Sequence, residues 1–251
     1  MEAIYLDCGA RRPQLKRNPL GRSQEMGSTH KVLQPDFLDR IAIRKSISKQ
    51  LDGIWIGSFG DASHAHAILQ RVEEALGLIK RFDPNRYARL CRDLSRIWVL
   101  PLPGFNGRYN VTLNACQLDV TFVLHPQTPL ALVAATIVHE ATHARFQHSG
   151  ISYREGFRPR IERACRRAEI GFAAKLPDGG AVRQRAEQAL SIPDQVWSTR
   201  ALHLREVQGY AKALHERGWP RWLLAMIVIT GVVIAGTIAF IRRVASGLTR
   251  A

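Results

Sequence analysis

Residues 130–148 have the sequence LALVAATIVHEATHARFQH. No Pro or Gly interrupts this stretch, so it predicts one α-helix that ends near Ser149-Gly150. His139 and His143 are four residues apart and share one helix face, which allows both imidazoles to bind a single metal ion. Glu140 follows the first histidine directly and can accept a proton from a metal-bound water.

The HExxH spacing predicts a zinc site. Neutral imidazole suits Zn²⁺, which lowers the pKa of its bound water to about 7. A chance HExxH in a chain of this length has odds on the order of one per cent, so we favour a metal site over a solvated helix with accidental histidines. We therefore predict Zn²⁺ as the cofactor, His139 and His143 as ligands and Glu140 as the general base.

The motif resembles that of the zincin metallopeptidases, whose active-site helix carries HExxH. The resemblance covers roughly residues 95–175. Arg145 stands where an apolar residue is common, and Phe146 and Ser149 depart from the metzincin form, which has Gly and His at these positions. The resemblance therefore implies a gluzincin-like peptidase that hydrolyses peptide bonds with metal-activated water.

In gluzincins the third ligand is a Glu on a following helix, and the chain predicts such a helix from Pro159 to about Lys175. Glu162 and Glu169 lie seven residues apart on the border of its apolar face, where a carboxylate requires a cation. We predict Glu162 as the ligand. Glu169 is the alternative, or else it orients a ligand histidine. Glu155 in the intervening loop is a weaker candidate, and simple pairing of both helix glutamates with arginines is the competing interpretation.

The resemblance also implies a Tyr or His that stabilises the oxyanion. The candidates are His203, Tyr210, His148 and Tyr153. For each, an ordinary polar surface residue is the competing interpretation.

Around the motif, period-two patterns at Arg96–Leu100, Tyr109–Leu113 and Leu118–His125 predict three short strands. Helical patterns precede and follow them. We therefore expect an α+β fold in residues 36–218: a zincin-like domain with a small, mainly antiparallel sheet, an active-site helix and a ligand helix. Zincins often place an edge strand above the cleft, so Leu118–His125 is predicted to bind an extended peptide or to be an ordinary sheet strand.

The ends of the chain differ from the centre. Residues 222–241, WLLAMIVITGVVIAGTIAFI, carry no charge and are long enough to predict one transmembrane helix, followed by a short basic tail at 242–251. Residues 1–35 predict a disordered basic tail without a signal peptide. We therefore expect a single-pass membrane protein with its N-terminal domain in the cytoplasm.

The charge balance is strongly basic, with 36 Lys+Arg against 21 Asp+Glu and a formal net charge of +15. No nucleic-acid-binding motif accompanies this charge, so a membrane surface is the expected anionic partner and nucleic acid is not expected. The four scattered cysteines predict free thiols.

The sequence thus predicts a membrane-anchored zinc metallopeptidase that acts on peptides or proteins. The first alternative is a catalytically inactive membrane-anchored scaffold with a zincin-like fold, against which Glu140 argues because metal binding does not need it. A basic membrane-surface adapter without a metal is a weaker alternative. Nothing in the sequence indicates the oligomeric state.

Overall fold

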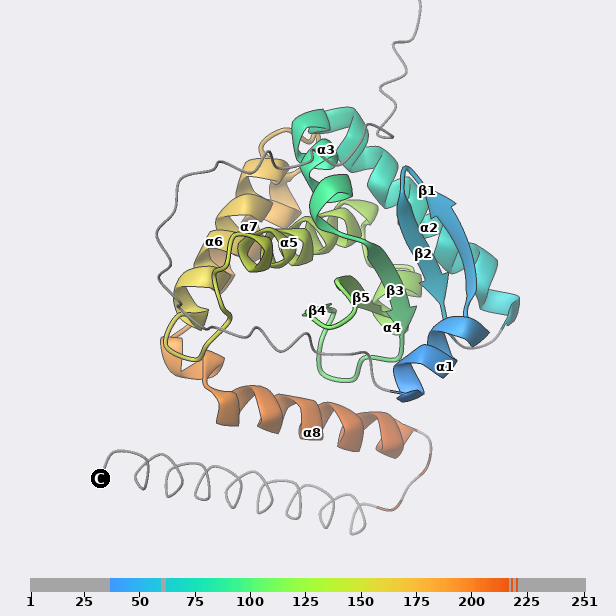
Figure 1. Ribbon diagram of the computed structural model, residues 1–251. Helices are drawn as coiled ribbons and strands as arrows, with labels where there is room; N and C mark the ends of the chain where they lie inside the picture. Colours follow the sequence, from blue (N-terminus) through green and yellow to red (C-terminus); the bar gives the residue numbers. More distant parts are fainter. Residues whose placement is uncertain (1–36, 60–61, 217, 219, 221–251) are drawn as a thin grey trace, which may run out of the picture.

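The computed structural model describes residues 37–59, 62–216, 218 and 220 (Figure 1). The predicted tails 1–35 and 242–251 and the predicted transmembrane helix 222–241 lie outside the described residues. Among the helices that are described, none combines the length and the apolar character needed to cross a membrane. The elements are α1 (Phe37–Lys45), β1 (Ile47–Leu51), β2 (Ile54–Ser58), α2 (Ala62–Phe82), α3 (Pro84–Asp93), β3 (Arg96–Leu100), β4 (Gly107–Asn110), β5 (Ala115–Asp119), α4 (Val120–Leu124), α5 (Leu130–His148), α6 (Arg158–Ala173), α7 (Gly180–Leu190), the 3₁₀ helix η1 (Asp194–Trp197) and α8 (Thr199–Glu216).

The described strands form one five-stranded sheet in the order β1-β2-β3-β5-β4. β1 pairs with β2 and β4 with β5 in antiparallel fashion, whereas β2–β3 and β3–β5 are parallel. The prediction of an α+β fold with a small, mainly antiparallel sheet is therefore wrong. The chain has a mixed α/β fold in which the central pairings are parallel.

One of the two parallel pairings, β2–β3, involves the hairpin β1–β2, which was not predicted from the sequence. Asp52 and Gly53 form its turn with positive φ angles of 48° and 83°, which suits a tight hairpin. From β2 the chain passes through α2 and α3 before it enters β3, and parallel neighbours require a helical crossover of this kind. The apolar face of α2 packs on the sheet and buries Val72, Leu76 and Ile79 completely.

The predicted strand Leu118–His125 is also wrong. β5 ends at Asp119, and residues 120–124 form the short helix α4. The Asp119 carboxylate accepts hydrogen bonds from the backbone N–H groups of Phe122 and Leu102, which caps α4 and ends the strand. The described sheet has β1 at one edge and β4 at the other, and β4 covers Gly107–Asn110 rather than the predicted Tyr109–Leu113.

α5 runs through the middle of the molecule, with α6 and α7 beside it (Figure 1). Its bounds agree with the helix predicted from the sequence. α8 lies apart from this bundle and meets the loop before β4. Gly104 (φ +87°) and Gly209 lie backbone to backbone there, since a Cβ added to Gly209 would be 2.4 Å from the Gly104 nitrogen.

Candidate metal centre

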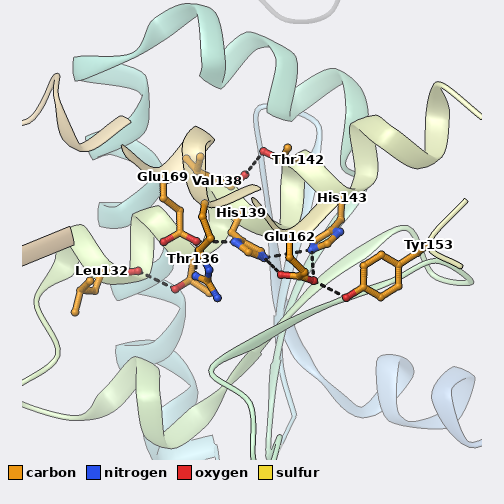
Figure 2. Close-up of polar contacts among 10 residues, drawn as sticks. Leu132, Thr136, Val138, His139, Thr142, His143, Tyr153, Glu162 and Glu169 are labelled. Carbon is orange, nitrogen blue, oxygen red and sulfur yellow. Dashed lines mark hydrogen bonds and ion pairs between the residues drawn. The ribbon is translucent and has the colours of Figure 1, made fainter. Parts of the chain in front are cut away.

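Helices α5 and α6 bring together the three residues predicted as ligands (Figure 2). His139 and His143 lie one turn apart on α5, with their Nε2 atoms 3.2 Å from each other. Glu162 on α6 faces both rings. Its Oε2 lies 3.3 Å from His139 Nε2 and its Oε1 lies 3.4 Å from His143 Nε2. Two imidazole nitrogens and one carboxylate thus converge on a single point.

These separations fit a tetrahedral metal ion. Zn²⁺ lies about 2.0–2.1 Å from nitrogen and oxygen ligands, and a tetrahedron of that size holds its ligand atoms about 3.3–3.4 Å apart. The Nε2–Nε2 separation of 3.2 Å is close to that value, and each Nε2 has a different Glu162 oxygen at 3.3 or 3.4 Å. The two histidines and Glu162 therefore offer nitrogen and oxygen donors to one metal ion.

A second possible ligand set is made by His139, His143 and Cys165. Their ligand atoms all lie within 4.8 Å of one another, so this buried cluster could hold a metal ion. Glu162 is not in this set, although one of its oxygens lies 3.3 Å from His139 Nε2 and the other lies 3.4 Å from His143 Nε2. Burial, followed by the charges of nearby glutamates, raises the pKa of the Cys165 thiol well above its usual value in the absence of a metal. Glu162 and Cys165 are therefore the two candidates for the third ligand.

Glu169 occupies the other side of the His139 ring. Its Oε1 lies 2.5 Å from His139 Nδ1 and also 2.5 Å from Arg166 Nη1. A carboxylate at Nδ1 fixes the ring orientation and leaves Nε2 directed toward Glu162 and His143. This contact is the one expected of Glu169 if it orients His139 as a ligand, which stays a prediction.

The centre concentrates acidic groups in the interior. Glu140 and Glu162 are each 5% exposed and Glu169 is 2% exposed. Burial raises the pKa of Glu140 and outweighs the opposing charges of His139 and His143. Burial would lower the pKa of His139, but its hydrogen bonds to Glu162 and Glu169 prevail and raise that pKa to about 9. The same cluster that holds this proton would bind a metal cation in its place.

The centre opens into a pocket of about 630 Å³. Glu140, His139 and His143 line it, together with the loop before β4, α6, η1 and the first half of α8. Gly107 at the start of β4 passes close to α5: a Cβ there would lie 2.6 Å from Thr136 Cγ2 and 3.2 Å from Glu140 Oε1. The absence of a side chain at Gly107 therefore lets the edge strand approach the proposed base.

Of the four candidates for oxyanion stabilisation, Tyr153 and His203 line the pocket, whereas Tyr210 and His148 do not. The Tyr153 hydroxyl donates a hydrogen bond to Glu162, and its ring meets His143 edge-on at 5.1 Å (Figure 2). His203 lines the same pocket from α8. Tyr210 is 49% exposed and, like His148, is not among the residues that line the pocket. The Glu155 carboxylate instead accepts hydrogen bonds from the backbone N–H and the hydroxyl of Thr199.

Three features were not predicted from the sequence: Cys165 at the centre, the close approach of Gly107 to α5, and the arginines Arg166 and Arg185 in the pocket. Cys165 had a usable signal, because it lies three residues after Glu162 and so borders the same helix face. Gly107 and Arg185 come from other elements, and only the tertiary structure places them. In comparisons with known proteins, no protein-family model, curated protein or solved structure matches this chain.

Proposed function

We propose that this chain is a zinc-dependent metallopeptidase. One observation carries the proposal: His139, His143 and Glu162 converge with separations of 3.2–3.4 Å, and Glu140 lies beside them in the same open pocket. A purely structural zinc site has no need for a carboxylate that binds no metal and faces a pocket. When bound, zinc would polarise the scissile carbonyl and make a water molecule acidic at neutral pH.

The residues of the chain would do the rest of the chemistry. Glu140 accepts the proton of the attacking water and passes it to the leaving amine, as a general base and then a general acid. Glu169 holds the His139 ring in place, and Tyr153 does the same for the Glu162 carboxylate. A peptide in extended form would pair with β4, whose outer edge has no neighbouring strand in the described sheet.

The test compares the full-length wild-type chain with Glu140→Gln. We expect about one zinc per chain in both proteins by elemental analysis, and a loss of peptide cleavage of about 10²–10⁴-fold in the variant. The exposed Glu187 on α7 provides a matched control, and Glu187→Gln should retain full cleavage.

Two results would contradict the proposal. A folded, zinc-supplemented wild-type protein without zinc would exclude the metal site. Zinc binding without cleavage of any peptide in a broad library would instead support a catalytically inactive scaffold.

A further inference from the structure

The pocket beside the metal centre is rich in arginine. Five arginines line it against four glutamates, two of which, Glu162 and Glu169, are engaged with the histidines. A bound divalent cation would make its interior still more positive. The arginines are Arg108, Arg158, Arg166, Arg185 and Arg205.

Three of these arginines already have partners that explain their position. Arg108 bonds Gln117 and Glu206, and Arg158 bonds the Trp197 carbonyl and the Thr199 hydroxyl. Arg205 stacks on aromatic rings of the loop before β4 and of η1. These three side chains tie the pocket walls to α8 and to each other.

The guanidinium of Arg185 on α7 lies over the Phe122 ring, 5.9 Å from its centre. Arg185 is half-buried and lines the pocket, and within the described part of the chain it makes neither a hydrogen bond nor an ion pair. Its charged neighbours are Glu169 and Arg166. Glu169 already bonds both His139 and Arg166, so one carboxylate faces two guanidinium groups and an imidazole.

Arg166 is also incompletely satisfied. Its Nη1 binds Glu169, but its Nε, like that of Arg158, is buried without a hydrogen-bond partner among the described residues. A buried donor without an acceptor is costly, and a guanidinium matches a carboxylate in charge and geometry. Two adjacent arginines with spare donors therefore form a binding site for an anion next to the metal ligands.

We propose that Arg185 and Arg166 bind a carboxylate of the substrate, so that the enzyme takes peptides with an acidic group close to the scissile bond. That group is an acidic side chain or the C-terminal carboxylate of a short peptide. This inference rests on the proposed metallopeptidase function. Arg185 sets the specificity, whereas Arg166 also supports Glu169 and is the less suitable residue for a test.

The experiment measures the dissociation constants of four zinc-binding peptide hydroxamates with the full-length, zinc-loaded protein. The peptides carry Glu or Gln at the residue next to the hydroxamate, and end in either a carboxylate or an amide. One type of carboxylate should strengthen binding by about tenfold or more, as expected of a charge-assisted hydrogen bond. The type that does so identifies the acidic group.

Arg185→Gln should reduce the preference for a carboxylate to about onefold. It should leave the dissociation constant of the peptide that carries Gln and ends in an amide unchanged. Arg183 gives the matched control, because it lies on the same helix, exposed and paired with Glu187. Arg183→Gln should keep the full preference.

Three outcomes separate the two proposals. Equal binding of all four peptides by the wild-type protein would overturn the carboxylate site while leaving the zinc site intact. A preference that survives in Arg185→Gln would overturn the assignment to Arg185. If the zinc-supplemented protein holds no zinc and binds none of the hydroxamates, the metallopeptidase proposal itself is overturned.

Discussion

Two clusters of buried carboxylates in this molecule differ in the positive groups that lie against them. At the corner between α2 and α3, Asp83 is only 1% exposed and binds the Arg86 side chain and backbone N–H together with Lys175. Between α5 and α6, Glu140, Glu162 and Glu169 are buried around two histidines, and the one ion-paired arginine is Arg166. Asp83 is neutralised by two permanently charged residues, Arg86 and Lys175. The α5–α6 cluster has more carboxylates than permanent cations.

This difference separates a structural cluster from a candidate functional one. A buried carboxylate without a cation is costly, so it must bind a proton or a metal ion. Asp83 satisfies this requirement with permanent charges and needs nothing further. The α5–α6 cluster satisfies this requirement with titratable histidines, and a metal ion can take the place of their protons. The following predictions test whether the two clusters differ in this way.

The largest effect is expected at Glu162, the proposed third ligand. Replacement of a residue that orients a metal ligand weakens zinc binding by about 10–100-fold, so loss of a direct ligand should cost more than about 100-fold. We therefore expect Glu162→Ala to lose zinc at concentrations that saturate the wild-type protein, as measured by competition with a chromogenic chelator. Cys165→Ala should bind zinc as the wild type does.

The reverse pattern would assign the third ligand to Cys165 and leave Glu162 as a partner of the histidines. Circular dichroism of both variants serves as the control, because each replacement also removes a buried side chain between α5 and α6.

The helix bearing the histidines could be predicted from the sequence because its signal is local. Residues 130–148 have no helix breaker, and α5 covers this range. The α6 pattern likewise places Glu162 and Glu169 on one border of the helix. Which of them faces the two Nε2 atoms depends on how α6 packs against α5, and the sequence analysis could only rank the two.

The sheet could not be predicted to the same extent. The alternation in Leu118–His125 resembles a strand, but the capping of α4 by Asp119 ends β5 there. The hairpin β1–β2 did have a local signal in Asp52-Gly53, flanked by apolar residues, and missing it removed the parallel pairing β2–β3. The parallel pairing β3–β5 had no local signal, because strand order is set by tertiary packing.

A smaller effect on zinc is expected at Glu169. Glu169→Gln keeps the shape of the side chain but removes the charge that faces His139 Nδ1 and Arg166. We expect zinc affinity to fall by about 10–100-fold while the stoichiometry at saturation stays at one. Chelator competition measures both quantities. Unchanged affinity would show that Glu169 only pairs with arginine, which is the role of Asp83 in the other cluster.

The smallest effect is expected at Asp83, and it should appear in stability rather than in zinc binding. Asp83→Asn keeps the volume but loses the charge that holds Arg86 and Lys175. Both partners are partly exposed, so water compensates for part of the loss, and we expect the free energy of unfolding to fall by about 1–2 kcal/mol. Urea unfolding measures this change. A change in zinc affinity would contradict the separation of the two clusters.

The pH dependence of that effect tests its cause. Burial by itself would raise the pKa of Asp83, but the hydrogen bonds from Lys175 and Arg86 prevail and lower it below its ordinary value of 3.8. Because the pKa is lower in the folded state, the stabilisation is fully present above the unfolded value and is lost as the pH falls through the folded value. The difference in unfolding free energy between the wild type and Asp83→Asn should therefore stay constant from about pH 7 to 5 and shrink below about pH 4. Zinc release in acid affects both proteins equally, so it cancels in this difference. A difference that persists undiminished at the lowest pH would mean that the shape of the carboxylate, and not its charge, stabilises this corner.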